Sequence, residues 1–324
     1  MRISRLHKNL RVGPRPSGRA LTNVLIAVAT YKRPGLLREL LDSLVAQTVS
    51  ADTFSVIVVD NDANASAAQV VQDFDNSLQI EYAHEPTPGI AAARNRALAG
   101  DLSRFDWVAF VDDDETADPG WLKSLLSTAA STGASIVAGP VVTHLPPGSP
   151  WWVRRYKPYD LLDGEDQEPV RWAATNNSLI SVDRLTRLEQ PYFSEEFSMT
   201  GGSDAELFWR LGQTGSAIIF SSSAIVRETI PSSRTTFAWW WRRSVKQGNV
   251  SGRLMLRQHR PIVVAAIGIA RILVGATLGT VSLVAPSTRT FVHLPKGVGT
   301  LNAIRGSYVL EYARARGATE VRPE

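Results

Sequence analysis

Three consecutive aspartates, Asp112, Asp113 and Asp114, are the residues of this 324-residue chain with the most evident capacity for chemistry. They directly follow an apolar run at 107–111 (WVAFV). Clustered carboxylates repel one another, and a bound cation relieves that repulsion. In proteins, Mg²⁺ usually takes one or two carboxylates together with the phosphates of a substrate. The triplet therefore predicts a divalent cation that holds a diphosphate, with a solvated acidic turn as the alternative.

Polar residues also follow two earlier apolar runs. The run at 23–29 (NVLIAVA) ends in Thr30, Tyr31, Lys32 and Arg33, and the run at 54–59 (FSVIVV) ends in Asp60, Asn61 and Asp62. In open α/β sheets, ligands bind beyond the carboxyl ends of the strands. If the three runs are neighbouring strands, their ends form one polar edge, and the acids after a second strand favour the cation site over the solvated turn.

The elements that must position these residues alternate between strand and helix patterns. Strands are expected at 23–29, 54–59, 78–83, 107–111, 135–142, 177–182 and 217–220. Helices are expected from Pro34 through an apolar stripe at 36–45, and at 90–98, 119–130 and 203–211. This alternation predicts βαβ units and a mainly parallel sheet, hence an α/β fold. The stretch 143–172, rich in Pro, Trp and Arg, is expected to be a long functional loop.

The last ninety residues have a different pattern. Residues 236–258 are expected to form a helix, and 262–285 form an apolar run that contains one charge, Arg271. That length could span a bilayer, and its Gly275-x-x-x-Gly279 spacing would let two helices approach closely. The alternatives are a helix lying on the membrane and a buried or interfacial helix pair. The run is flanked by basic residues that suit an anionic cytoplasmic surface, namely Arg253, Arg257, Arg260 and Arg289.

Composition narrows the classes of function. With 44% hydrophobic and 20% charged residues, the chain is globular in composition, and the absence of cysteine excludes disulfide, zinc-thiolate and cysteine-nucleophile chemistry. The net charge of +4 comes without a basic stripe interleaved with aromatics, so no nucleic-acid partner is expected. Residues 1–21 carry basic residues without an acid and are expected to be a disordered tail, with weak attraction to an anionic membrane as the alternative. No signal peptide is visible, which favours the cytoplasm.

Six segments, in this order and spacing, resemble the family 2 glycosyltransferases of the GT-A fold. They are VLIAVATYKRP (24–34), VIVVDND (56–62), EPTPGIAAARNRAL (85–98), FVDDDE (110–115), NNSLIS (176–181) and GGSDAELFWR (201–210). Within the family, the chain resembles the bacterial exopolysaccharide enzymes of the succinoglycan glucosyltransferase type. The resemblance implies a Rossmann-like nucleotide-diphospho-sugar transferase domain over 22–234 with a mainly parallel mixed sheet. The helical region 235–324 would then be a membrane-associated extension.

The resemblance also implies roles in a nucleotide-sugar site. Thr30, Tyr31 and Arg33 would contact the nucleotide, Asp60 and Asp62 would lie at the uracil and ribose, and Arg94 would reach the nucleotide or its phosphates. Asp112 and Asp114 match the D-x-D pattern. Asp114 would ligate Mg²⁺ or Mn²⁺, and Asp112 would face the ribose or the metal. Asp113 lies in the same site without a defined role.

By the same resemblance, Asp204 would be the general base of an inverting transferase. A sugar hydroxyl is a poor nucleophile, so a carboxylate must take its proton as it attacks the anomeric carbon. The alternative is an acid that stabilises a helix N-terminus, with Ser203 as the N-cap and Glu206 as its partner. The implied reaction transfers a hexose, expected to be glucose, from a UDP-sugar to a polyprenyl-linked oligosaccharide at the cytoplasmic face of the inner or plasma membrane.

The chain departs from the family pattern at several positions. Ser203 stands where members often have Glu, and Arg227-Glu228-Thr229 stands where many have a metal-ligating His. The Q-x-x-R-W signature of processive synthases is absent, which favours transfer of a single sugar. Two other functions remain as alternatives. A nucleotidyltransferase or phosphotransferase would need a Gly-rich phosphate cradle after the first strand, where this chain has TYKRP. An inactive membrane scaffold is disfavoured by the intact acids.

Two further groups of residues have open roles. Arg234 and Arg242 could contact the diphosphate or belong to a solvated basic helix. The aromatic residues of the irregular stretch could stack on an acceptor sugar or cover a sheet edge; they are Trp151, Trp152, Tyr156 and Tyr159.

Overall fold

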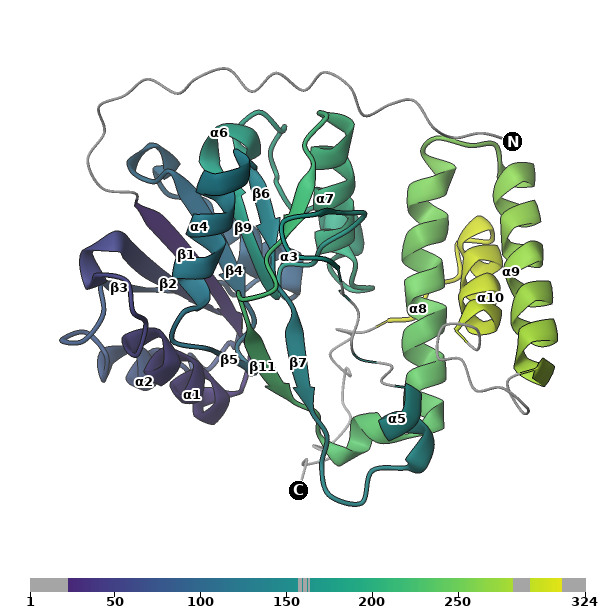
Figure 1. Cartoon of the computed structure of the whole chain (residues 1–324), viewed down its shortest axis with the longest axis horizontal. Helices are drawn as coiled ribbons and strands as arrows, with labels where there is room; N and C mark the ends of the chain where they lie inside the picture. The colour runs from purple at the N-terminus through teal and green to yellow at the C-terminus, as the bar shows by residue number, and fades with distance from the viewer. Residues whose placement is uncertain (1–22, 157–158, 160–161, 163, 282–291, 311–324) are drawn as a thin grey trace.

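The computed structural model of the protein describes residues 23–156, 159, 162, 164–281 and 292–310. The expected basic tail, 1–21, lies outside these residues. Figure 1 shows an α/β body beside a group of three C-terminal helices. The polar edge predicted from the strand ends lies in the α/β body.

The α/β body is built on an eight-stranded sheet with the order β3-β2-β1-β4-β9-β6-β10-β8. Its strands are β1 (Val24–Thr30), β2 (Phe54–Asp60), β3 (Ile80–His84), β4 (Trp107–Val111), β6 (Ile136–Ala138), β8 (Pro169–Val170), β9 (Asn177–Ser181) and β10 (Ile218–Phe220). Neighbours pair in parallel except β9, which is antiparallel to β4 and β6, and β8, which is antiparallel to β10. The expected mainly parallel mixed sheet is therefore confirmed.

Helices cover both faces of this sheet (Figure 1). On one face, the buried side chains of α1 (Pro34–Val45), α2 (Ala68–Gln72) and α4 (Trp121–Thr132) share one apolar core with Val24, Ile26 and Val28 of β1. On the other face, those of α3 (Ile90–Ala97), α6 (Val182–Leu185) and α7 (Ser203–Gln213) share a second core with Leu25 and Ala27. Because alternate residues of a strand point to opposite faces, a central strand covered on both faces must be apolar throughout, as the run at 23–29 is.

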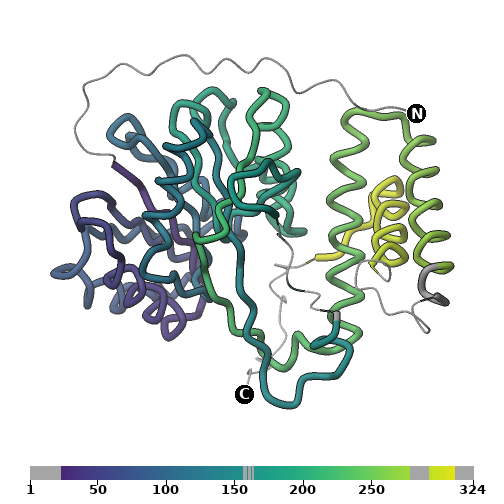
Figure 2. The backbone as a smooth tube through the Cα atoms, in the orientation of Figure 1, coloured from purple at the N-terminus to yellow at the C-terminus, as the bar shows by residue number. Residues whose placement is uncertain are grey.

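A second sheet of three strands has the order β5-β11-β7 and comprises β5 (Glu115–Ala117), β7 (Val141–His144) and β11 (Val226–Thr229). The expected strand at 135–142 is wrong as one element, because β6 and β7 belong to different sheets. Gly139 and Pro140 separate them. Pro140 has no N–H for a sheet ladder, and a Cβ on Gly139 would lie 2.1 Å from the carbonyl oxygen of Ala224. The small sheet extends from the large one toward α5 (Trp151–Tyr156) and the start of α8 (Phe237–Leu256) (Figures 1 and 2).

Two other expectations needed correction. The helix expected at 119–130 begins at Trp121, because Asp118, Pro119 and Gly120 form a turn in which the Trp121 amide donates to the Asp118 carbonyl at 2.8 Å. The stretch 143–172, expected to be a loop, contains α5 and β8. Short 3₁₀ helices occupy Ala51–Thr53, Leu102–Arg104, Glu195–Phe197 and Ser232–Thr235.

The C-terminal region consists of α8 (Phe237–Leu256), α9 (Pro261–Val281) and α10 (His293–Ile304). Glycines let these helices approach closely: a Cβ on Gly299 would lie 2.0 Å from the carbonyl oxygen of Val245, and one on Gly275 would lie 2.3 Å from the amide of Leu294. Arg271 is turned into the helix group, where it donates to the hydroxyls of Ser251 and Thr300. Among the described residues, no helix combines the length and apolar character needed to cross a membrane. The end of the apolar run, 282–285, lies outside those residues.

Candidate active site

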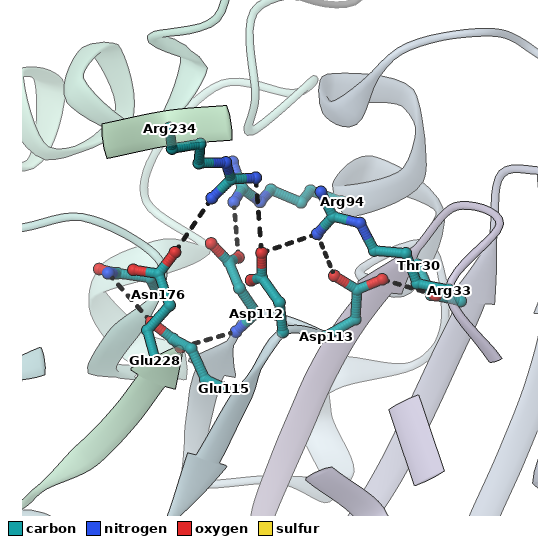
Figure 3. A network of polar contacts seen from close by, with 10 residues as sticks. Thr30, Arg33, Arg94, Asp112, Asp113, Glu115, Asn176, Glu228 and Arg234 are labelled. Atoms are coloured by element: carbon teal, nitrogen blue, oxygen red, sulfur yellow. Dashed lines mark hydrogen bonds and ion pairs between the residues drawn. The ribbon is translucent and has the colours of Figure 1, made fainter. Parts of the chain in front are cut away.

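The carboxyl ends of β1 and β4 bring the first polar cluster together. The two strands are parallel neighbours, with Ala27 opposite Phe110. The Thr30 hydroxyl donates to Asp113 at 2.7 Å, and one Arg33 guanidinium nitrogen donates to Asp113 at 3.0 Å and to Asp114 at 2.8 Å (Figure 3). The predicted meeting of the two strand ends therefore occurs, and the middle aspartate is its best-bonded member.

Two further arginines approach the same carboxylates from other elements. Arg94 on α3 donates to Asp112 at 3.1 Å. Arg234, in the 3₁₀ turn before α8, donates to Glu228 at 3.1 Å and lies 3.7 Å from Asp114 (Figure 3). Arginines from three separate parts of the chain thus converge on the aspartates 112–114, called the acidic edge below. This arrangement suits recognition of phosphate oxygens.

Two glutamates add to the acidic edge from the small sheet. Glu115 of β5 and Glu228 of β11 are directly opposite in an antiparallel pair. Like charges in this position destabilise a sheet. Glu115 accepts from the amide of Asp112 at 3.1 Å and from the Asn176 side chain at 3.2 Å. With these contacts, Glu115 is buried beneath the three aspartates and is only 2% exposed.

Burial and mutual repulsion raise the pKa values of several carboxyl groups at the acidic edge. Burial raises the pKa of Asp112 against the opposing effect of Arg94, and it raises the pKa of Asp113 to about 6. Burial together with Asp112 raises the pKa of Glu115 well above its usual value. Burial and the neighbouring Asp114 raise the pKa of Glu228 to about 7. A cation placed among these groups would remove much of this cost.

The donor set fits a hard divalent cation in part. Among the described residues, no three carboxylate or imidazole side chains are arranged to enclose a metal by themselves. Asp112 and Asp114 supply two carboxylates at the cavity wall, which suffices for Mg²⁺ or Mn²⁺ when substrate phosphates and water complete the shell. The oxygen-only chemistry and the raised pKa values around the pair are consistent with a cation that arrives together with a diphosphate.

A cavity of about 660 Å³ opens over this edge. The predicted residues that line it are Thr30, Tyr31, Arg33, Arg94, Asp112, Asp113 and Asp114. Asn61 also lines the cavity, whereas Asp60 and Asp62, predicted to lie at the uracil and ribose, are not among its wall residues.

Asp60 has a local structural task. Its side chain is 0% exposed, and its two oxygens accept from the backbone amides of Asp62 and Ala67 at 2.9 and 2.7 Å. These bonds shape the turn after β2. Asn61 in that turn donates to the carbonyls of Glu85 and Thr87, both at 2.7 Å. The turn thereby fixes the segment that leads into α3 and Arg94.

A second cavity of about 560 Å³ adjoins the first, and Asp204 lies in its wall. The two cavities share six wall residues: Ile90, Arg94, Asp112, Asn176, Glu228 and Arg243. Asp204 is in the first turn of α7, and its negative charge contributes to the raised pKa of Asp112. The predicted base is therefore beside the triplet, although ninety residues separate them in the chain.

The N-terminus of α7 differs from the capping box considered above. Gly202 is the N-cap, with φ of 96°, and Ser203 is the first helical residue, whose buried hydroxyl has no hydrogen-bond partner within the described part of the chain. Glu206 instead pairs with Arg210 at 3.0 Å and with Arg257 at 2.5 Å. Asp204 is thus the acid of this turn that faces a cavity, while Glu206 is committed to ion pairs.

Helix α8 holds the segment that carries Asp204. A Cβ on Gly202 would lie 2.4 Å from Val250 of α8. Arg253, 6% exposed, donates to Thr200 at 2.9 Å and to the Glu196 carboxylate at 2.6 Å, and its guanidinium stacks 3.7 Å from the ring centre of Phe197. The C-terminal helices therefore form one wall of the second cavity and support the turn that carries Asp204.

Sequence reasoning gave no role to Glu115, Glu228, Asn176 or Arg243, all of which line the cavities. Glu115 and Asn176 lie inside matching segments, and Glu228 lies at a position that departs from the family pattern, but only strand pairing reveals that Glu115 and Glu228 meet. Of the residues with open roles, Arg234 reaches the acidic edge, whereas exposed Arg242 donates to the carbonyl of Leu310. Tyr159 lines the second cavity, Trp152 packs on Phe237 and Trp240, and Trp151 is 71% exposed.

Comparison with protein families gives a match over half of the chain. The model of Glycosyl transferase family 2 matches residues 25–186. Among curated proteins, the chain is 38% identical over 233 residues to the succinoglycan biosynthesis protein ExoM of Rhizobium meliloti strain 1021, covering 71% of this chain and 74% of that protein. The family match covers β1, β2 and β4 and the turns that follow them.

Solved structures show the same fold at low sequence identity. The mannosyltransferase PcManGT from Pyrobaculum calidifontis, in complex with GDP-Man and Mn²⁺, has a TM-score of 0.58 and 17% identity, with 92% of this chain and 91% of that chain covered. S. aureus TarS 1–349, in complex with UDP, has a TM-score of 0.53 and 16% identity, with 91% and 98% covered. Both alignments extend over more than the α/β body.

Proposed function

The chain belongs to glycosyl transferase family 2, and on that premise we propose that it transfers a hexose, glucose, from a UDP-sugar to a polyprenyl-linked saccharide in the synthesis of an exopolysaccharide or another cell-surface polysaccharide. One observation carries the proposal: a cavity lined by carboxylates and arginines adjoins a second cavity that contains Asp204. Donor and acceptor would meet at their shared wall, beside Asp112, Arg94 and Glu228.

The first cavity suits a nucleoside diphosphate. Arg33, Arg94 and Arg234 present guanidinium groups around the acidic edge, and each can exchange its carboxylate contact for a phosphate contact. Asp112 and Asp114 would hold Mg²⁺ or Mn²⁺. The metal supplies charge stabilisation to the departing diphosphate. The complex of TarS with UDP supports a uridine donor, and the complex of PcManGT with GDP-Man is the precedent for a guanosine donor.

Inversion would follow from a base and a leaving group on opposite sides of the sugar. The acceptor hydroxyl gives its proton to the Asp204 carboxylate while its oxygen bonds to the anomeric carbon. The bond from that carbon to the diphosphate oxygen breaks at the same time, and its electron pair leaves with UDP. Asp204 belongs to the second cavity only, so it can approach the acceptor without displacing the donor.

A donor screen tests this function. Purified protein is incubated with each nucleotide-sugar and a membrane extract as the source of acceptor, and release of UDP or GDP is measured. We expect UDP release from UDP-glucose that requires both extract and divalent metal. Release of GDP from GDP-mannose with none from UDP-sugars would overturn the donor assignment. No release from any donor, with UDP bound, would overturn the transfer itself.

We also propose that the protein lies at the cytoplasmic face of the membrane, and the surface of α9 supports contact with a membrane. Its outward side presents exposed apolar residues and no exposed charge: Ile262, Val263, Ile269, Leu273 and Val274. An apolar helix face of this kind marks an interaction surface, and a membrane interface would cover it. Leu273→Glu is expected to reduce co-sedimentation with anionic lipid vesicles by about tenfold, because a carboxylate disfavours burial in the interface and is repelled by anionic lipid. UDP binding should not fall, since Leu273 lines neither cavity. Unchanged sedimentation of the variant would contradict the membrane assignment.

A further inference from the structure

The second cavity has charges of opposite sign on its two walls. Its α/β wall carries the acids Asp112, Asp204 and Glu228, with Arg94 paired to Asp112, whereas its helical wall carries Arg243, Lys246 and Lys296. A neutral saccharide needs a base and hydrogen-bonding groups but no cluster of cations. The basic wall therefore calls for a second explanation.

Lys296 is the most informative of these cations. Its described surroundings are basic: burial lowers its pKa, and Arg271 and Arg243 lower it further. His293, one turn earlier on α10, has its pKa lowered by burial, Lys296 and Arg271. Among the described residues, no carboxylate lies within ion-pair distance of the Lys296 ammonium group. Burying mutually repelling cations destabilises a fold unless an anion joins them.

The position of Lys296 is fixed by close backbone packing. A Cβ on Gly248 of α8 would lie 2.2 Å from the Lys296 carbonyl oxygen. The neighbouring contact between Gly299 and Val245 locks the same two helices together. Lys296 is therefore held on a rigid support at the cavity wall, as a residue that binds a ligand must be. Arg271 donates hydrogen bonds to the hydroxyls of Ser251 and Thr300, and its positive charge acts on Lys296.

We propose that the helical wall of this cavity binds a phosphate group of the acceptor through Lys296, with Arg243 and Lys246 beside it. This inference rests on the proposed function and names the acceptor class: a saccharide that carries a phosphate ester. Phosphate oxygens accept several charge-assisted hydrogen bonds at once, which matches three cations on one wall. The saccharide hydroxyl then lies at the acidic wall, beside Asp204, and Trp172 and Tyr159 offer aromatic faces to the sugar between them.

The test begins with the donor site filled. Wild-type protein is titrated with UDP and Mn²⁺, which measures donor binding alone, and the saturated protein is then titrated with glucose 1-phosphate or methyl glucoside. We expect the phosphate ester to bind at least tenfold tighter than the neutral glucoside. Lys296→Gln should weaken glucose 1-phosphate binding at least tenfold and leave UDP binding unchanged. Arg305→Gln, which removes an exposed cation at the end of α10, should change neither.

A lipid arm distinguishes the source of the phosphate. Neutral phosphatidylcholine vesicles, with and without polyprenyl phosphate, replace the soluble ligand. Binding that needs both polyprenyl phosphate and Lys296 supports the proposal with a lipid headgroup as the source, whereas Lys296-dependent binding of glucose 1-phosphate alone supports it with a soluble one. Equal binding of every phosphate probe by wild type and Lys296→Gln overturns it. A failure of UDP to bind would instead count against the donor site.

Stability separates a ligand-binding lysine from a structural one. Lys296→Met removes a partly buried cation that Arg271 and Arg243 repel, so the unfolding temperature of the unliganded protein should rise by about 2 °C. The same variant should lose the stabilisation that glucose 1-phosphate gives to wild type. A lower unfolding temperature together with wild-type phosphate binding would show that Lys296 serves the fold only.

Discussion

Replacing Asp204 by asparagine is expected to abolish transfer while UDP binding stays at its wild-type level. Asparagine has nearly the same size and fits the same first turn of α7, but its amide cannot take a proton from the acceptor hydroxyl. General bases contribute about 10²–10⁴-fold to rate, so kcat should fall by at least that lower bound. UDP affinity should be unchanged, because Asp204 lines only the second cavity. Kinetics of UDP release and calorimetric titration with UDP measure the two effects.

Glu206→Gln is the matched control for this variant. Glu206 lies two residues away in the same turn, but its carboxylate is 2% exposed and pairs with Arg210 and Arg257. Breaking those pairs should lower the free energy of unfolding by about 3 kcal/mol. The loss of kcat should be much smaller than in Asp204→Asn. If Asp204 served only the helix dipole, Asp204→Asn would change stability by about 0.3–1 kcal/mol and preserve transfer. Retained transfer in Asp204→Asn would therefore remove it as the base.

The α/β body was predictable because each buried strand is specified locally. Val24, Ile26 and Val28 pack on one face of β1, and Leu25 and Ala27 pack on the other, so a continuous apolar run was the correct signal for a two-sided strand. The polar residues after β1 and β4 followed from the same logic, since parallel neighbours end at one edge. The direct contact of Thr30 with Asp113 confirms that step.

The small sheet was not predictable from periodicity. Residues 135–142 form one apolar run, yet they belong to two sheets, because the break at Gly139-Pro140 depends on the close approach of Ala224 from a distant segment. β5 is three residues long, too short for an alternation to be visible. The pairing of Glu115 with Glu228 joins positions more than a hundred residues apart, and it is this pairing that brings the two glutamates to the acidic edge.

In the two polar triplets, 112–114 and 60–62, the sequence predicted the place of the triplet better than the role of each residue in it. In Asp112–Asp114, the middle residue received no role, but it contacts Thr30 and Arg33. In 60–62, both outer acids were expected at the nucleotide, but Asn61 lines the cavity and Asp60 bonds to the backbone. A turn can point successive side chains in any direction, so sequence identifies the turn and not the residue in it that faces the ligand.

Replacing Asp114 by alanine is expected to remove the dependence of UDP binding on divalent metal. In wild type, Mn²⁺ should tighten UDP binding at least tenfold, equivalent to about 1.4 kcal/mol, because the metal neutralises the repulsion between the acidic edge and the diphosphate. Asp114→Ala removes one of the two proposed metal carboxylates, and it leaves Arg33 and Arg234 with one acidic partner fewer to compete with phosphate. UDP should then bind more tightly than to wild type without metal, and less tightly than to wild type with it. Calorimetry with and without Mn²⁺ measures all four affinities.

The control and the pH dependence make this result specific. Asp118→Asn removes a carboxylate that pairs with Arg227 and lines neither cavity, so its metal dependence should match wild type.

Protons compete with the metal for carboxylates. Because burial raises the pKa of Asp113 to about 6 and that of Glu228 to about 7, both groups are largely protonated at pH 5.5 and ionised at pH 8. The tightening by Mn²⁺ should therefore be strong at pH 8 and weak at pH 5.5 in wild type, and small at both in Asp114→Ala. Equal UDP binding by wild type with and without Mn²⁺ at pH 8 would contradict the metal assignment, and the arginines alone would then have to hold the diphosphate.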